Sequence, residues 1–469
     1  MRSGENNFVF HRPISVGLRA ALLATAVFVP SVSADSLQDA LVKAYQSNPQ
    51  LLAERANLRA TDEEVSQAIA QWRPRITFSS DYSKTHTDAK NDRSPSNPLG
   101  QPTHLKTEPW NADITASQTV FAGGRILAQR RQADARVNAG RARLHATEQS
   151  VFLDAIAAYM NVVRDEAVLK LNQSNVELLK KQREAAQARF DVGEITRTDV
   201  AQAEARLAAG TAAQTSAEAN LKASRLSYER IVGEAPGTLE QKPGVPPIPS
   251  SEDEARKVAL DSNPNLASAR AAENAAEYGV DLAVAQMMPS VRVDASYGRN
   301  GQERGPESIG DSASIRATAT VPLYQGGAEW SQIRQAKELN NKARLDTEDA
   351  RRATDQSVSN SWEAYRAAKA SSEANREQVK ASEIAFEGVQ QELEVGSRTT
   401  LDVLDQQQEL LNARVALVRS ERDEVVAGYS LLASVGKLTA GELQLPVQLY
   451  EPTDNYDMQT WRPFGAATY

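Results

Sequence analysis

The chain has 469 residues, with 53 Lys and Arg against 61 Asp and Glu, a net charge of −8 and no cysteine. The absence of cysteine excludes disulfides and thiolate sites, and the acidic balance argues against a nucleic-acid partner, which needs a basic face on the protein. Only four histidines remain, none of them at metal-ligand spacing, so we expect no metal, no cofactor and no enzyme activity.

The N-terminus has the pattern of an export signal. A positive segment with three arginines, Arg2, Arg12 and Arg19, leads into the apolar run Ala20–Val29 and then into small residues, Val32-Ser33-Ala34. This order is typical of a secretory signal peptide, and the apolar run is too short to span a bilayer. We expect residues 1–34 to be a signal peptide and the mature chain to begin at Asp35. The alternative is a buried N-terminal helix.

The rest of the chain is an internal duplication. Ser47-Asn48-Pro49-Gln50-Leu51 recurs 215 residues later as Ser262-Asn263-Pro264-Asn265-Leu266. Further on, Val192-Gly193 and Asp199-Val200 recur 203 residues later as Val395-Gly396 and Asp402-Val403. Constant offsets at so many positions indicate a repeat. We therefore divide the chain into a first repeat (35–232), a Pro/Gly-rich equatorial linker (233–250), a second repeat (251–435) and a C-terminal equatorial segment and tail (436–469).

Each repeat begins with a helix and contains one very long helix. The runs Arg125–Asp191 and Ala328–Val395 contain no proline and one glycine each. Runs of this length predict helices of about 100 Å, which need coiled-coil packing for stability. Shorter helices are predicted over residues 36–72, 198–232, 251–287 and 399–435. In the last of these, a heptad of mostly apolar residues runs from Leu401 through Leu404, Gln408 and Leu411.

Four segments alternate apolar and polar residues, at 76–82, 112–117, 291–297 and 315–323. Period two predicts strands with one apolar and one polar face, suited either to a membrane β-barrel or to an ordinary sheet over a core. Four strands cannot close a barrel, and open edges are not tolerated in lipid, so three chains would have to pool twelve strands. The loops Lys84–Thr107 and Gly298–Ser314 would then face outside the cell. The tail from Pro452 either packs on the equator of the helical body or is disordered.

Two motifs identify a family. The duplication, the segment Val321-Pro322-Leu323-Tyr324-Gln325-Gly326-Gly327 and the segment from Val395 to Asp405 resemble the TolC family of outer-membrane channel-tunnels over nearly the whole mature chain. The resemblance implies a homotrimer with a twelve-stranded barrel in outer-membrane lipid and a long periplasmic helical tunnel. It also implies a periplasmic adaptor protein and an inner-membrane transporter of RND, ABC or MFS type as partners. Such a channel is a passive exit duct for drugs, small molecules or unfolded proteins, in efflux or type I secretion.

Acidic residues near the helical hairpins are the candidate site. Asp402 and Asp405 are three residues apart, so they share a helix face, and a trimer would gather them into an anionic ring. The resemblance implies that these acids form the periplasmic gate and selectivity ring. It also implies that Arg398 reaches across to Thr198 and Asp199 and holds the gate closed. Leu393 departs from the family pattern, which has a tyrosine in this lock.

Other interpretations of these motifs remain open. Asp199 and Asp402 also fit capping boxes with Thr196 and Thr399. The glycine pairs Gly123-Gly124 and Gly326-Gly327 are expected to make strand-to-helix turns with positive φ. The alternative to the export duct is a periplasmic coiled-coil adaptor or structural protein without a pore.

Overall fold

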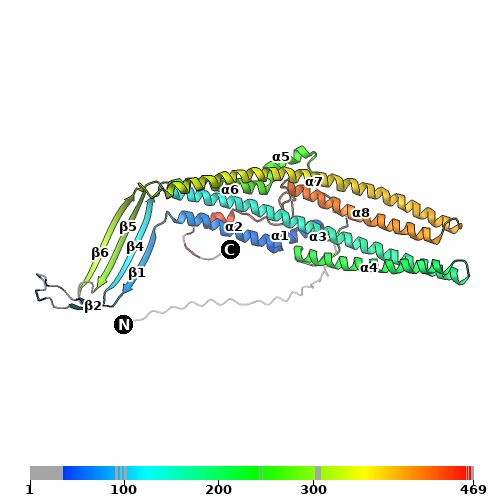
Figure 1. The fold of residues 1–469 in the computed structure, drawn as a ribbon, viewed down its shortest axis with the longest axis horizontal. Coiled ribbons are helices and arrows are strands. Elements are labelled where there is room, and N and C mark those ends of the chain that lie inside the picture. The colour runs from blue at the N-terminus through cyan, green and yellow to red at the C-terminus, as the bar shows by residue number, and fades with distance from the viewer. Residues whose placement is uncertain are drawn as a thin grey trace, which may run out of the picture.

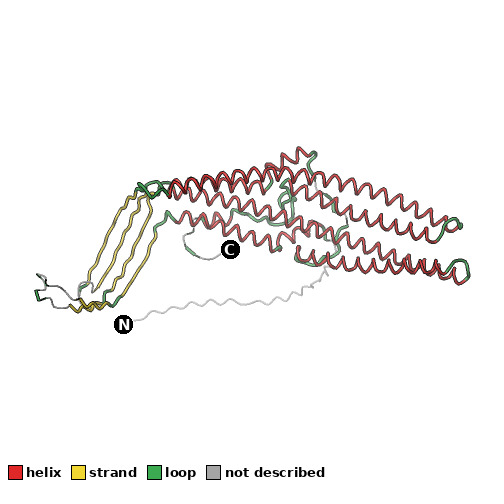
Figure 2. Tube along the Cα trace, viewed as in Figure 1, coloured by secondary structure: helices red, strands yellow, loops and turns green. Residues whose placement is uncertain are grey.

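The computed structural model describes residues 35–469, apart from residues 90–92, 94, 96–97, 100–102, 242, 246, 302–307, 461, 463 and 466–469. The predicted signal peptide lies outside the described residues. The chain forms one elongated body with a sheet at one end and two helical hairpins at the other (Figure 1). Figure 2 shows that the strands are confined to the sheet end and that helices make up nearly all of the rest. In the described part of the chain, no helix combines the length and the hydropathy needed to cross a membrane.

The two long helices match the proline-free runs. Helix α3 spans Arg125–Asp191 and helix α7 spans Ala328–Glu394, each of 67 residues. Each is followed by a tight turn and an antiparallel partner, α4 (Arg197–Val232) or α8 (Thr400–Ser434). These bounds confirm the predicted helices within one or two residues. The predicted seam of α8 is partly wrong. Leu404 is buried as predicted, but Leu401 is exposed, and the half of the helix next to the hairpin turn also buries Val403, Gln407 and Leu410.

The two helices predicted as single elements each break at an Asn-Pro pair. The first is divided into α1 (Leu37–Ser47) and α2 (Pro49–Ala70), the second into α5 (Glu252–Ser262) and α6 (Pro264–Ala285). Asn48 and Asn263 adopt extended backbone, with ψ of 122°. A residue before proline is driven out of the helical region, which explains the breaks. Helix α6 packs on both α3 and α7, and α5 packs on α7 (Figure 1).

Each Asn-Pro asparagine also ties its repeat together. The buried Asn48 accepts from the backbone N–H groups of Gln50 and Leu51 and donates its amide to the Ile231 carbonyl at 3.0 Å. Asn263 makes the same bonds at the start of α6, and its donor bond to the Ser434 carbonyl is 2.9 Å long. Because Ile231 and Ser434 lie in the last turns of α4 and α8, one side chain caps the start of one helix and the end of another.

The four predicted strands form one antiparallel sheet in the order β1-β4-β5-β6. They span Arg75–Tyr82, Trp110–Phe121, Ser290–Gly301 and Ile309–Thr320. The last strand ends before Val321 and Leu323, which were predicted to belong to it; Pro322 cannot donate to a ladder. Inside the predicted outer loop, β2 (Thr85–Ala89) and β3 (Thr103–Thr107) form a further hairpin that the sequence did not predict.

The sheet has one apolar and one polar face, as its alternation predicts. Apolar rows cross all four strands: Ile76, Ala116, Ala295 and Ile315, then Phe78, Ile114, Tyr297 and Ala313. The row between them, on the other face, consists of Thr77, Thr115, Ser296 and Ser314. Ile76, Phe78 and Ile315 are 69, 69 and 82% exposed, so this apolar face does not cover a core of its own chain.

The hydrophobic core lies around the middle of α3. Phe152, Ile156 and Tyr159 are fully buried there, against α1 and against Leu438 of the C-terminal segment. The hydroxyl of Tyr159 donates to the carbonyls of Asp35 and Glu240, at 2.9 and 3.1 Å. These bonds join the start of the described chain and the linker to the core.

The C-terminal segment packs on helices α2 and α3 of the first repeat. Its last helix, α9 (Asp454–Gln459), lies along α2 (Figure 1). Asn455 donates to the buried Asp62 of α2 at 2.9 Å, and the hydroxyl of Tyr456 donates to Asp134 of α3 at 2.8 Å. Of the two alternatives for the tail, packing on the helical body is therefore correct as far as Gln459; Trp461, in the same tail, lies outside the described residues.

Candidate functional site

The ends of the two hairpins, farthest from the sheet, are built in the same way. Gly193 and Gly396 have φ of 83° and 79°, and each N–H bonds back to the carbonyl three residues earlier. The next residue's N–H bonds to the Arg189 or Glu392 carbonyl, at 2.9 Å in both hairpins. This is the Schellman arrangement, which needs a left-handed residue and so favours glycine.

Both capping boxes are present. The Asp199 carboxylate accepts from the N–H and hydroxyl of Thr196 at 2.9 and 2.8 Å, and Asp402 accepts from those of Thr399 at 2.8 Å each. These bonds hold the pKa of both carboxyls below their usual value. For Asp402, the guanidinium of Arg398 contributes a smaller lowering. Both acids are therefore ionised caps of helix N-termini, whatever further role they have.

Within one chain, Arg398 is paired inside its own hairpin. Its Nε donates to Glu392 at 2.8 Å, while Asp199 bonds to Thr196 and Thr198 lies exposed in the first turn of α4. The first hairpin has a matching ion pair with the order of the charges reversed: the arginine comes first, and Arg189 donates to Glu194 at 3.1 Å. Each hairpin turn is thus closed by an ion pair of its own. Arg398 and the Thr198–Asp199 turn belong to two different hairpins.

Asp405 pairs with a residue that the sequence did not single out. Its carboxylate accepts from the guanidinium of Arg206, on α4 of the other repeat. Two further bonds join α8 to the first repeat: Gln407 donates to Asn175 at 2.6 Å in a buried position, and Arg422 donates to Asn161 at 3.0 Å. Sequence reasoning missed Arg206 because nothing in the motif around Asp405 indicates which helix lies opposite.

The glycine pairs lie in the connections from β4 to α3 and from β6 to α7. Gly123, Gly124, Gly326 and Gly327 have φ of 59°, 86°, 72° and 83°, the left-handed region that side chains rarely adopt. Gly123 is also crowded, since a Cβ there would lie 2.1 Å from the Cβ of Met288. These turns redirect the chain from the tilted sheet into the helical body.

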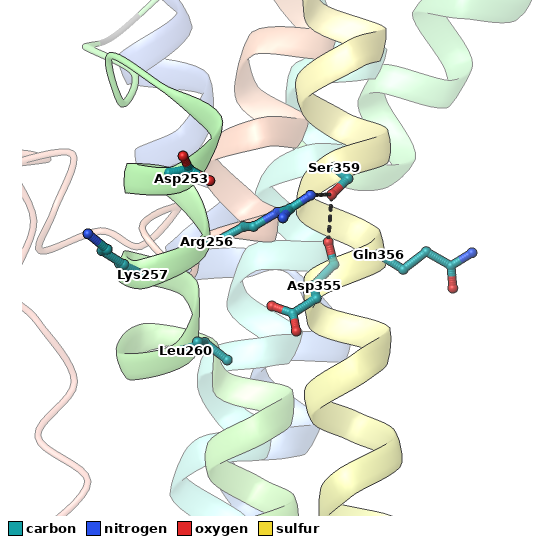
Figure 3. A pocket seen from close by; sticks show the side chains of 7 residues that line it. All are labelled: Asp253, Arg256, Lys257, Leu260, Asp355, Gln356 and Ser359. Carbon is teal, nitrogen blue, oxygen red and sulfur yellow. Dashed lines mark hydrogen bonds between the residues drawn. The ribbon is translucent and has the colours of Figure 1, made fainter.

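A polar groove of about 610 Å³ lies between α5 and α7 (Figure 3), near the middle of the helical body (Figure 1). Its arginine, Arg256, donates to Glu252 and to the hydroxyl of Ser359, at 2.6 and 2.8 Å. The guanidinium of Arg256 is therefore already bonded within the chain. Across the described residues there is no group of three or more His, Asp or Glu placed to hold a metal ion.

Known proteins that are similar to this chain in sequence or in fold are outer-membrane proteins. A family model described as outer membrane efflux protein matches residues 40–234 and 255–437. The chain is 35% identical over 451 residues to the outer membrane efflux protein BepC of Brucella suis biovar 1, with 96% of both chains covered. It is 25% identical over 442 residues to the outer membrane protein TolC of Vibrio cholerae, covering 91% of this chain and 95% of the relative. The fold matches the crystal structure of the Campylobacter jejuni CmeC outer membrane channel with a TM-score of 0.74 at 16% identity, covering 91% and 89% of the two chains.

Proposed function

The chain belongs to the outer membrane efflux protein family, and from that premise we propose how it works as a gated exit duct. It is an outer-membrane protein of a Gram-negative bacterium with a periplasmic tunnel, and it serves efflux or type I secretion without enzyme activity of its own. The alternative of an adaptor or structural coiled coil without a pore is therefore wrong. Channels of this family work with periplasmic adaptors and inner-membrane transporters. A transporter of RND, ABC or MFS type remains our proposal for this chain.

We propose a homotrimer, and the unequal burial of the two long helices supports it. Helix α3 buries 26 of its 67 residues, whereas α7, of the same length, buries six. Apolar side chains along α7, including Leu339, Leu345 and Ile384, are 56, 71 and 73% exposed. A long helix that buries so few of its residues and exposes large apolar side chains favours an interface with another chain. A neighbouring copy of the chain would cover it.

The sheet supports the same assembly. Strands β1 and β6 are its edges and are exposed along their whole length. Edge strands offer unpaired backbone groups, which a lipid environment does not tolerate. Pairing β6 of one copy with β1 of the next would close twelve strands around three copies, with the apolar rows toward lipid.

We propose that the hairpin ends form the gate. In a trimer, Asp402 and Asp405 would form an anionic ring at the periplasmic entrance, and the lowered pKa of Asp402 would keep its carboxylate charged over the physiological range. Arg398 would reach Thr198 and Asp199 of a facing hairpin and hold the gate closed. The adaptor and transporter would release these bonds. With Leu393 in place of the family's tyrosine, that lock would lack one bond.

Single-channel conductance of the purified protein in a planar bilayer tests the gate. We expect the wild type to show a small, cation-preferring conductance, and Asp402→Ala/Asp405→Ala to give a larger current with weaker cation preference. Asp39→Ala is the matched control, because Asp39 closes a capping box with Ser36 at the start of α1, away from the hairpins. Unchanged current and selectivity in the double variant would place the constriction elsewhere.

A further inference from the structure

The ion pair between Arg206 and Asp405 joins the two repeats at the gate end. Arg206 lies in the third turn of α4 and Asp405 in the second turn of α8, so the bond crosses from one hairpin to the other. Both side chains are about half exposed, at 40 and 54%. The bond therefore forms at the surface of the hairpin pair, where relative movement of the hairpins would break it.

The pair is not a feature of the repeat itself. The offset of 203 residues that relates the hairpins places Gln202 at the position of Asp405 and Glu409 at that of Arg206. The repeat-related contact, between Glu409 and Gln202, therefore cannot be an ion pair. The bond depends on how α4 and α8 meet in the folded chain.

The position of Arg206 changes the charge of the proposed ring. Asp402 and Asp405 are three residues apart on α8 and share a face. With Arg206 bonded to Asp405, that face has one net negative charge per subunit instead of two. Asp402 is meanwhile fixed in its capping box.

We propose that Arg206 couples the charge of the constriction to its opening. In the closed channel, Arg206 neutralises Asp405 and ties the two hairpins of a subunit together. When the hairpins separate, the bond breaks and Asp405 is exposed to the passing ions, so cation selectivity rises with opening. This inference rests on the proposed function, since it requires the constriction to lie at these hairpins.

Arg206→Gln in the full-length protein, reconstituted in a planar bilayer, is the first test. An exposed ion pair shifts an equilibrium by about 1.4- to 5-fold, so three copies opening together would raise the open probability roughly three-fold or more. Cation preference should rise as well, because Asp405 loses its counter-charge. Asp405→Asn should raise the open probability but lower cation preference. The double variant should match Asp405→Asn in open probability, because the same bond is missing in both.

A matched control lies on the same helix. Arg225 of α4 donates to Glu166 of α3 at 2.7 Å, an ion pair within one hairpin. Arg225→Gln removes an equivalent charge without separating the hairpins, so its open probability and selectivity should stay at the wild-type values. Equal effects of Arg206→Gln and Arg225→Gln would overturn the inference, because net charge alone would then explain the result.

The absence of native cysteine allows a second test. In Arg206→Cys/Asp405→Cys, a short bifunctional maleimide should join the hairpins and keep the channel closed, whereas the unreacted variant should conduct like Arg206→Gln/Asp405→Asn. If cross-linking leaves the open current unchanged, the inference fails. Asp402→Asn distinguishes failure of this inference from failure of the proposed function. If Asp402→Asn changes the selectivity while Arg206→Gln has no effect, the gate lies at the hairpins but the inference about Arg206 is wrong. If none of these variants changes the current or the selectivity, both the inference and the proposed gate are wrong.

Discussion

The paired asparagines Asn48 and Asn263 offer a direct test of how the duplication is held together. Asn48→Ala removes an N-cap, which costs about 1 kcal/mol. It also leaves the buried Ile231 carbonyl without its 3.0 Å donor, which costs about 1–3 kcal/mol. The free energy of unfolding should therefore fall by about 2–4 kcal/mol, and Asn263→Ala should have the same effect through the Ser434 carbonyl.

Equilibrium urea unfolding of the detergent-purified protein, followed by far-UV circular dichroism at fixed protein concentration, measures these losses. The two asparagines share no partner, so their losses should add within about 0.5 kcal/mol in the double variant. Asn57→Ala is the control, because Asn57 is exposed on α2 and its side chain donates to Glu54 of the same helix, at 3.2 Å. Losses at Asn48 and Asn263 no larger than that control would refute the idea that these side chains cap two helices at once.

Two further predictions use the same assay. Gly123→Ala should destabilise the protein by about 1–3 kcal/mol more than Gly326→Ala. Both positions have positive φ, but only at Gly123 would the new Cβ collide with Met288. Equal losses of stability would show that the crowding at Gly123 is relieved without cost. Burial raises the pKa of Asp62 despite the bond from Asn455, so the native state favours the protonated carboxyl and loses stability as pH rises above about 4. Asp62→Asn should thus be more stable than the wild type at pH 7, with an advantage that shrinks toward pH 4, and a pH-independent difference would contradict this reasoning.

The sequence alone determined the elements that depend on local chemistry. The long helices follow from runs without proline, and their bounds at Arg125–Asp191 and Ala328–Glu394 agree with prediction. The turns at Gly193 and Gly396 and the capping boxes at Asp199 and Asp402 were also visible, because each involves residues within a few positions of one another. The Asn-Pro pairs were recognised as repeat markers, but the helix breaks that they cause were not predicted.

Only the tertiary structure decided which surfaces meet. A heptad pattern in α8 predicted one seam, yet the helix buries Val403 and Gln407 because α3 packs on it as well as α7. The pairing of Asp405 with Arg206 joins residues 199 positions apart, and no local signal specifies such a contact. The same holds for Asp62 and Asn455, where the chain after α8 returns to cover α2. Local sequence sets backbone conformation, whereas partners distant in sequence are set by how the helices pack around the core.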